Sequence, residues 1–420
     1  MSWKVVSAME QRVRMMAQWE SGAESVAELC RRYGISRKTA YKWWVRWREQ
    51  GVEGLAERSR APQRQAQRIA PAWERAVVEA RGGHPTWGPK KLLVELEKRT
   101  AELGEELPAR STIGAILQRH GLSWARQPRR RASASAAPLA HATAANRVWA
   151  ADYKGWFRCG DGAACYPLTI SDDYSRYLLR CQALTGVEEA LARPVFEAAF
   201  REYGMPEAIR TDNGPPFASA GLCGLSHMSV WWLRLGIRLE RIEPGQPQQN
   251  GRHERLHRTL KAEATAPPAA DLRRQQARLD AFRREYNAAR PHEALGQATP
   301  ESWYEVAAPR PYPARLPDYE YPARCQLRRV AADGSIRWNW ARLSLTRALR
   351  GEQVALEEVA EGVWQVRFCQ LVLGEFDERA LARRRDRDAW LRLRRPSGPP
   401  SPQPGAAEEE TEKVLPMCVD

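Results

Sequence analysis

Three acidic residues stand where they could support metal-ion chemistry. Asp152 lies among apolar residues in "WAADYKG", Asp212 follows "AIRT" where the turn "NGPP" begins, and Glu254 opens a helix-forming stretch rich in Arg, His and Lys. Carboxylates at adjacent strand ends and on a crossing helix can converge, and Mg²⁺ prefers a few carboxylates with water and substrate phosphates. Two ions roughly 3.5–4 Å apart would activate the attacking oxygen and stabilise the leaving one in phosphoryl transfer. Asp152 would then bridge the metals, with Asp212 and Glu254 each holding one.

Glu254 also has a simpler interpretation. It could pair with Arg258, four residues on, and Arg258 and Lys261 would then belong to a surface salt-bridge ladder that stabilises the helix by only ~0.3–0.5 kcal/mol per pair. The chain has 51 acidic residues, so an Asp/Asp/Glu set carries little information without its context. If the metal interpretation holds, Arg258 and Lys261 share a helical face with Glu254 and could contact DNA phosphates.

Other polar residues near these motifs favour structural roles. Asp172 and Asp173 in "ISDDYSRY" are expected to shape a hairpin turn, with Arg176 pairing nearby. His253 and His257 flank Glu254, but two His without a Cys or third His indicate phosphate contact or solvent exposure rather than a zinc site. The pair Trp231–Trp232 is expected to pack in a core rather than stack on bases.

Strands and helices must position these acids. From Arg147 onward, "RVWAADYKGWF", "CYPLTISDDYSRYLLRCQAL" and "EAIRTDNG" are rich in β-branched and aromatic residues and bounded by turn formers, which predicts strands. A helix ending at Gly204 separates the second from the third. A further helix, the strand "IRLERIEP" and a helix over 250–263 follow, with 245–251 as a mobile loop. This order indicates a mixed α/β layered domain.

The N-terminal region, 1–60, is expected to be a helix-turn-helix unit. A break at Gly34–Ser36 separates two helices, Ser36 is a good N-cap, and the second helix has an apolar stripe of Ala40, Trp43, Trp44 and Trp47. The second helix would enter the major groove of DNA. The alternative is a helical hairpin with a charged outer face. The candidate DNA-contacting residues of this helix are Arg37, Lys38, Tyr41, Lys42 and Arg46.

A second helix-turn-helix-like unit is expected within 61–124. Pro85 and Pro89 mark the entry to its first helix, Ser111 could cap the second, and Gly121 ends that helix. Residues 125–146 are basic and then Ala/Ser-rich, a linker composition. Short strands with turns, notably at Asp333–Gly334, predict a small β-barrel over 320–380 that binds DNA. A basic segment and a disordered acidic tail are expected over 381–420.

Composition sets the class of partner. Lys and Arg number 66 against 51 acidic residues, a net charge of +15 that favours nucleic acid, although a basic solvated surface is the alternative. The eight cysteines form no C-x-x-C pair, which fits reduced thiols in a cytosolic protein. No apolar run approaches ~20 residues, and the N-terminus lacks a signal-peptide core, so we expect a soluble intracellular protein without membrane contact.

The motif order resembles a known family. The runs "WAADYKG", "TISDDYSRYLL", "IRTDNGPPFAS", "LSHMSVWWLRLGI" and "RIEPGQPQQNGRHERLHRTLKAE" resemble DDE transposases of the retroviral-integrase superfamily, and are closest to the insertion sequence 481 family. The resemblance covers about 147–304, including the closing "YNAARPHEALGQATPESWY". It implies an RNase H-like integrase core and a DDE site at Asp152, Asp212 and Glu254, with Mg²⁺ as cofactor, two per site, and Mn²⁺ able to substitute. The integrase-type N-terminal zinc module is absent, and the helix-turn-helix units stand in its place.

The resemblance predicts a multidomain DNA transposase. It would bind double-stranded DNA, both the terminal inverted repeats of a mobile element and the target, cleave the ends and join their 3′-hydroxyls to the target. A homo-oligomer on paired ends, in the bacterial cytoplasm and associated with the nucleoid, is expected. One alternative is a decayed transposase that acts as a repressor or architectural protein. Another is an RNase H-like nuclease acting on RNA–DNA hybrids.

Overall fold

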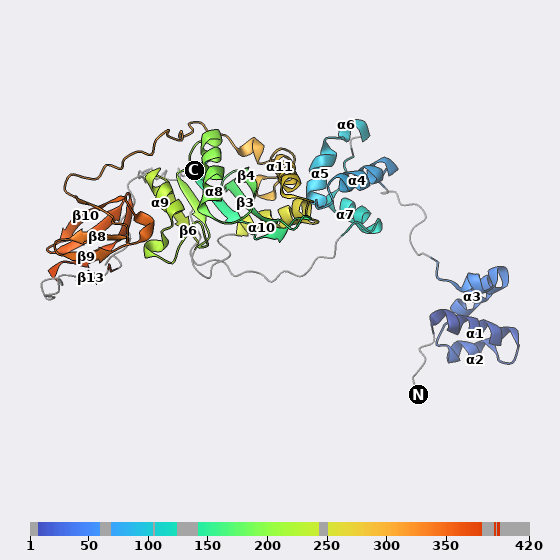
Figure 1. Cartoon of the computed structure of the whole chain (residues 1–420). Coiled ribbons are helices and arrows are strands. Elements are labelled where there is room, and N and C mark those ends of the chain that lie inside the picture. The colour runs from blue at the N-terminus through green and yellow to red at the C-terminus, as the bar shows by residue number, and fades with distance from the viewer. Residues whose placement is uncertain are drawn as a thin grey trace, which may run out of the picture. The chain divides into compact units, whose positions relative to one another are not determined.

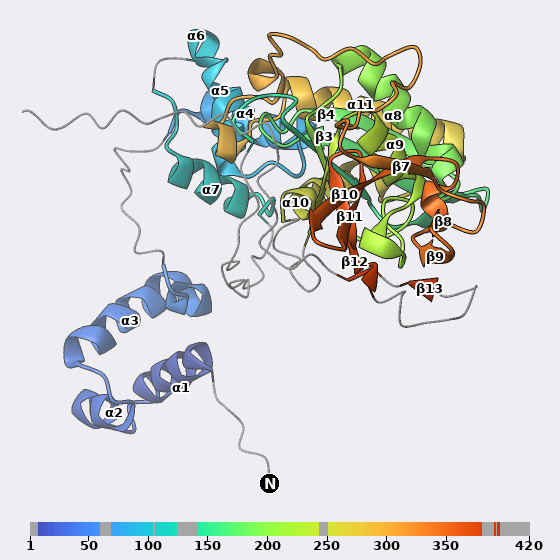
Figure 2. The same cartoon turned by 90° about the vertical axis from the view of Figure 1, so that its left-hand side faces the viewer.

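The computed structural model describes residues 7–58, 69–103, 106–123, 142–242, 251–379, 390–391 and 393–394. The chain divides into two compact units, Met1–Ile69 and Ala70–Asp420, and each is described here by itself. Figures 1 and 2 show the elements of both units from two sides. Parts of three predicted segments lie outside the described residues: the linker at 124–141, the loop at 243–250 and most of the C-terminal tail.

The first unit is a small helical bundle. Its elements are α1 (Ala8–Glu20), α2 (Val26–Arg32), α3 (Arg37–Gln50) and a 3₁₀ turn (Gly51–Leu55). Ser36 caps α3 by accepting a hydrogen bond from the Thr39 amide at 3.1 Å, and Gly34 takes a positive φ of 64° in the preceding turn. Ala40 and Trp43 are buried, whereas Trp44 and Trp47 are only partly buried against the same core. The predicted helix–turn–helix pattern is therefore confirmed.

The second unit begins with four further helices. They are α4 (Pro71–Gly83), α5 (Pro89–Glu97), α6 (Thr100–Leu103) and α7 (Arg110–Arg119). Pro89 is the first residue of α5, and Gly121 follows the end of α7 with a φ of 66°, as predicted. The prediction that Ser111 caps α7 is wrong. The extended residue Ala109 occupies the cap position and its carbonyl accepts from the Ile113 amide at 3.0 Å, so Ser111 already lies inside the first turn.

A mixed sheet forms the centre of the second unit. Strand β3 (Ala164–Asp172) lies between β1 (Val148–Tyr153) and β4 (Leu178–Leu184) and is antiparallel to both. The short β2 (Phe157–Arg158) pairs antiparallel with the start of β3. On the other side of β1, strands β5 (Ala208–Thr211) and β6 (Arg238–Arg241) run parallel to it. The hairpin-rich first half and the parallel second half match the predicted order of elements.

Helices cover both faces of this sheet. One apolar core contains residues of α8 (Glu189–Tyr203) and α9 (His227–Arg234), including the buried Trp231 and Trp232, which confirms their predicted core role. The other core contains residues of α10 (Gly251–Leu260), the π-helical turn Lys261–Thr265 and α11 (Leu272–Ala288). Strand β4 alternates between the two cores, with Leu179 facing the first and Leu178 the second. Short 3₁₀ turns lie at Leu222–Gly224, Glu293–Leu295, Glu301–Trp303 and Arg347–Leu349.

The C-terminal region is β-rich but does not confirm a small closed barrel. One sheet has the order β12 (Leu371–Asp377), β11 (Val363–Phe368), β10 (Gln353–Ala360), β7 (Gln326–Arg329), and the other has the order β13 (Trp390–Leu391), β9 (Ala341–Ser344), β8 (Ser335–Trp338). No strand pairing joins these two sheets among the described residues. They share one apolar core, which also includes Val230 and Leu233 of α9. Gly334 has a φ of 83°, as the predicted Asp333–Gly334 turn requires.

None of the helices formed by the described residues is both long and apolar enough to cross a membrane. The seven cysteines in the described part of the chain are all free thiols, as the cysteine spacing predicted.

Candidate active site

Asp152 and Asp212 leave neighbouring strands at the same edge of the central sheet. Strands β1 and β5 are parallel, with Ala151 opposite Thr211, so Asp152 is the next residue of β1 and Asp212 is the first residue after β5. Because parallel strands end at the same edge of a sheet, this register brings Asp152 and Asp212 to neighbouring positions at that edge. Asp212 also begins a turn, since its Oδ1 accepts from the Gly214 amide at 3.2 Å. The predicted placement of both aspartates at strand ends is therefore observed.

Glu254 lies in the first turn of α10, and its side chain is exposed. It forms no ion pair with any residue that the structure describes, including Arg258 and Lys261. The simple salt-bridge interpretation of Glu254 is therefore not observed. The predicted mobile loop before the helix, apart from Gly251, lies outside the described residues.

A short hydrogen-bonded chain connects α10 to the strand that carries Asp152. The hydroxyl of Thr169 on β3 donates to the main-chain oxygen of Asp152 at 3.0 Å and lies 2.8 Å from Nε2 of His257. His257 therefore donates from Nε2, and its Nδ1 lies 3.9 Å from Asp152 Oδ2. Burial, together with the nearby His253 and Lys154, lowers the pKa of His257 to about 2, so its imidazole is neutral and the last contact is not an ion pair.

The predicted solvent exposure is wrong for His253, whereas the His257 side chain stays 12% exposed, and phosphate contact by either histidine stays a prediction. His253 is only 2% exposed, and its Nε2 has no hydrogen-bond partner among the described residues. Burial lowers the pKa of His253 to about 4. His253 and His257 are four residues apart and therefore lie on one face of α10, the face that packs on the sheet, a position that the polar local sequence did not indicate.

The side chains of the three candidate acids do not form a complete metal-binding cluster in the described part of the chain. Within the described ranges, no group of three or more His, Cys, Asp or Glu side chains is arranged so that it could hold a metal ion. The structure thus places Asp152 and Asp212 at one sheet edge. It places Glu254 on the helix that His257 and Thr169 tie to that edge.

Asp172 has the turn role that its sequence context predicted. Its Oδ1 accepts from the Asn146 amide at 2.9 Å, and its Oδ2 accepts from the amide and hydroxyl of Ser175 at 2.8 and 2.7 Å. These neutral donors close the turn between β3 and β4. Burial raises the pKa of Asp172 above its usual range.

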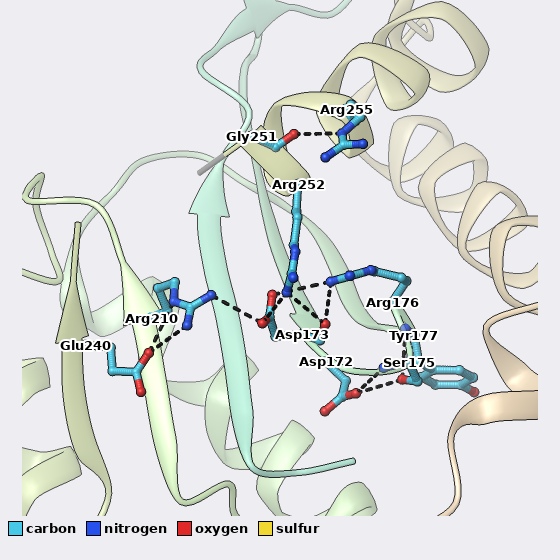
Figure 3. A network of polar contacts seen from close by, with 10 residues as sticks. All are labelled: Asp172, Asp173, Ser175, Arg176, Tyr177, Arg210, Glu240, Gly251, Arg252 and Arg255. Atoms are coloured by element: carbon cyan, nitrogen blue, oxygen red, sulfur yellow. Dashed lines mark hydrogen bonds and ion pairs between the residues drawn. The ribbon is translucent and has the colours of Figure 1, made fainter. Parts of the chain in front are cut away.

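Asp173 has a larger role than the sequence suggested. Its side chain is 2% exposed and forms ion pairs with Arg176, Arg210 and Arg252, as Figure 3 shows. Burial alone would raise the pKa of Asp173, but the hydrogen bond from Arg252 and the three positive charges outweigh it and leave that pKa below its usual range. The predicted pairing with Arg176 is confirmed at 3.5 Å, whereas the other two partners are distant in sequence and were missed.

Basic residues gather beside α10. A groove of about 360 Å³ includes Arg258 among its lining residues, and only one carboxylate, that of Glu293, lines it. Burial, with the charge of Arg290 nearby, lowers the pKa of Lys91 to about 8. Neither Lys91 nor Arg258 forms an ion pair with a described residue. The cationic side chains of the groove are Lys91, Arg176, Arg252, Arg255, Arg258 and Arg290.

The other predicted DNA contact on this helix, Lys261, lies outside that groove. The charges of Lys261 and Asp152 both act on Lys154, whose pKa is lowered mainly by burial. Lys154 follows Asp152 by two residues and comes directly after β1, and no sequence pattern singled it out. A pair of lysines thus lies near the candidate acids.

In the first unit, the predicted DNA-contacting residues lie on α3. Arg37, Lys38 and Tyr41 are exposed, and Tyr41 also packs edge-on against Trp19 with ring centroids 5.2 Å apart. Lys42 and Arg46 lie over the ring of Trp43 at 4.7 and 5.1 Å, so their stems cover the core while their charges stay near the surface.

Comparison with known proteins identifies the domains. Two models described as "Integrase core domain" match residues 142–247 and 235–300, a "Helix-turn-helix domain" matches 11–63 and a "Homeodomain-like domain" matches 39–117. A protein of insertion element IS407 from Burkholderia multivorans is 29% identical over 166 residues, which is 39% of this chain and 57% of that protein. A protein of insertion element IS476 from Xanthomonas euvesicatoria is 31% identical over 134 residues, 32% of this chain and 37% of that one.

The chain therefore spans about half or less of the length of these relatives. A solved simian T-cell lymphotropic virus intasome contains a chain that is 16% identical, with 71% of this chain and 97% of that chain covered, but its TM-score of 0.35 is too low to support a conclusion. The narrower insertion sequence 481 assignment stays a prediction. The matched integrase core and helix-turn-helix domains, with relatives encoded by insertion elements, support a DDE transposase of the retroviral-integrase superfamily.

Proposed function

We propose that this protein is a DNA transposase that binds the terminal inverted repeats of a mobile element, cleaves the element ends and joins them to target DNA. Water and then a 3′-hydroxyl serve as nucleophiles, so no covalent protein intermediate is needed. One observation carries the proposal: Asp152, near the end of β1, and Asp212, directly after the parallel β5, lie at one edge of the sheet, and Glu254, which has no ion pair with a described residue, lies on a helix hydrogen-bonded to that edge. The matches to integrase core domains and to insertion-element proteins support it.

Asp152, Asp212 and Glu254 are the proposed catalytic residues and the ligands of Mg²⁺, with two ions per site and Mn²⁺ able to substitute. Their oxygen donors suit a hard divalent cation. Asp212 and Glu254 have no ion-pair partner in the described part of the chain, so their negative charge is left for another cation. When bound, the metal would supply charge stabilisation for the attacking and leaving oxygens. For this, the exposed side chain of Glu254 must turn toward the strand ends.

DNA would contact the chain at several separate surfaces. The exposed residues of α3 would read the major groove, as helix-turn-helix domains do. Arg258 and Lys91 of the groove, with Lys154 and Lys261, would bind backbone phosphates near the acids. We assign DNA recognition to regions 1–60 and 61–124, catalysis to 147–304 and further DNA contact to 320–380. Two element ends must be joined in one reaction, which calls for a homo-oligomer.

A second candidate function is DNA binding without catalysis, as in a decayed transposase that represses or bends DNA. One observation favours it: the described residues contain no finished cluster of three metal-binding side chains. The two functions predict the same end binding and differ only in chemistry.

The test is strand transfer by the full chain with Mg²⁺ or Mn²⁺ and duplexes of its own element's ends. Wild type would be compared with Glu254→Gln and with Glu305→Gln, because Glu305 is equally exposed and also lacks an ion pair among the described residues. Joined products from wild type and Glu305→Gln, but not from Glu254→Gln, would support the transposase. End-specific binding without cleavage by any of the three would favour the non-catalytic protein.

A further inference from the structure

A buried charge network lies beside the start of β1, the strand that carries Asp152. Asp173 is its centre, and the arginines that contact it come from three separate segments of the chain (Figure 3). Two of these arginines stand in equivalent sequence positions, since Arg210 precedes Asp212 by two residues and Arg252 precedes Glu254 by two. We infer that Asp173 is a positioning residue, which fixes Asp212 and Glu254 relative to each other through Arg210 and Arg252. This inference rests on the proposed function.

On the sheet side, Arg210 is held at both ends of its guanidinium group. Its Nη1 lies 3.2 Å from Asp173 Oδ2, while Nη2 and Nε donate to Glu240 Oε2 at 2.9 and 3.2 Å. The Arg210 side chain is only 7% exposed, and Glu240 lies opposite it on β6. These contacts fix the end of β5, and with it the position of Asp212, which follows the strand.

On the helix side, Arg252 connects the first turn of α10 to the same carboxylate. Its Nη1 donates to Asp173 Oδ2 and, at 3.2 Å, to the main-chain oxygen of Asp173. Because Glu254 lies in the same helical turn as Arg252, these hydrogen bonds also fix the position of the Glu254 backbone relative to the sheet. His257 and Thr169 provide a second, neutral attachment one turn further on.

Asp173 is itself fixed to β1 and to the turn after β3. Its amide donates to the Val148 carbonyl at 2.9 Å, at the start of the strand that carries Asp152. Arg176, whose φ is 66°, folds back so that its Nη1 lies 3.5 Å from Asp173 Oδ1. One residue therefore contacts β1, the β3–β4 turn, β5 and α10, the elements that carry or support all three candidate acids.

The charge of Asp173, and not only its shape, is needed for this role. An ionised carboxylate only accepts hydrogen bonds, whereas an asparagine amide would turn an NH₂ group toward a guanidinium group. Asp173→Asn therefore keeps the volume but removes the negative charge that Arg176, Arg210 and Arg252 share. Asp172→Asn is the matched control, because Asp172 is equally buried but accepts only from neutral donors.

The experiment measures Mn²⁺ affinity by calorimetry and strand transfer with element-end duplexes, using the full chain as wild type, Asp173→Asn, Asp172→Asn and Arg252→Gln. The partly exposed Arg252 gives a variant that detaches only α10 if Asp173→Asn folds poorly. Circular dichroism and end-DNA binding report folding. We expect Asp173→Asn to lose about 10-fold in Mn²⁺ affinity, because residues that orient metal ligands typically contribute a factor of this order. We expect a loss of about 100-fold in strand transfer with end binding retained, because a displacement near 1 Å at a reacting centre costs about 100-fold in rate.

The outcomes separate this inference from the proposed function. Asp172→Asn with near wild-type Mn²⁺ affinity, and Arg252→Gln with a loss in the same direction as Asp173→Asn, would support positioning. Equal losses in the two aspartate variants would show a merely structural role and overturn the inference, as would wild-type behaviour of Asp173→Asn and Arg252→Gln. A wild-type chain that neither binds Mn²⁺ nor joins ends would refute the proposed function and the inference with it.

Discussion

Two sets of carboxylates in the second unit differ in burial and in ion pairing. Asp173 is 2% exposed and has three arginine partners, whereas Glu254 is exposed and Asp212 half-buried, and neither has an ion-pair partner among the described residues. A carboxylate whose oxygens are filled by guanidinium groups serves the fold. An exposed carboxylate without an ion pair among the described residues contributes little to the stability of the fold and remains available to a metal ion. The difference indicates a structural role for Asp173 and a metal-binding role for Asp212 and Glu254.

The largest expected effect is on stability, and it should appear only in the buried set. Asp173→Ala removes the shared partner of three arginines, and breaking a buried pair by removing one partner costs about 3–5 kcal/mol. Glu254→Ala removes an exposed side chain that has no ion pair with a described residue, so its unfolding midpoint should match wild type. Urea unfolding followed by tryptophan fluorescence compares the two. Equal destabilisation by both variants would contradict the division into buried and available carboxylates.

The pH dependence of stability should distinguish the adjacent aspartates by sign. The pKa of Asp173 is lowered by its arginines, so it contributes stability above the unfolded value of about 3.9, and that contribution is lost as pH falls through its folded pKa. The pKa of Asp172 is raised by burial, so its contribution is present below about 3.9 and is lost as pH rises through its folded pKa.

Urea midpoints between pH 3 and 7 test this pair. The advantage of wild type over Asp173→Asn should shrink as the solution is acidified, while its advantage over Asp172→Asn should grow. Slopes of the same sign for both variants would show that the arginines do not control the protonation of Asp173.

The same contrast applies to the cations. Arg252 and Arg176 are held by Asp173, but Arg258 forms no ion pair with a described residue and lines the basic groove. Arg258→Gln should weaken duplex binding several-fold and lower the slope of log affinity against log salt by about 0.9, the value for one phosphate contact. Fluorescence anisotropy from 50 to 200 mM salt measures the slope. Arg284→Gln, an exposed change on α11 outside the groove, should leave it unchanged.

Local patterns predicted much of this structure. The β-branched runs around Asp152 and Asp212 gave the correct strands, and the serine before α3 gave the correct cap, because these signals act over a few neighbouring residues. Ser111 shows the limit of such rules: the same residue type failed as a cap because the helix begins earlier, at a segment whose register is set by packing. The C-terminal strands were also expected correctly, but their partition into two sheets depends on pairings between distant segments.

The charge network could not be predicted from the sequence. Asp173, Arg210 and Arg252 are brought together only when β5 and α10 pack beside the β3–β4 turn, and nothing local to any of them indicates it. The one visible signal is an arginine two residues before Asp212 and another before Glu254. In a chain with 66 basic residues, that spacing has little value until the fold shows a common partner. Burial of His253 and His257 was missed for the same reason.

The smallest expected effect concerns the neutral attachment of α10. Thr169→Val keeps the shape of a buried side chain but removes the hydroxyl between Asp152 and His257. Because His257 is still 12% exposed and can reach water, we expect a cost of about 1 kcal/mol, or roughly a 5-fold loss of Mn²⁺ affinity. Thr259→Val is the control, since that hydroxyl donates only to Arg255 on the same helix. If Thr169→Val weakened Mn²⁺ binding as much as Asp173→Asn, then hydrogen bonding through His257, and not the buried charge, would be the main support of Glu254.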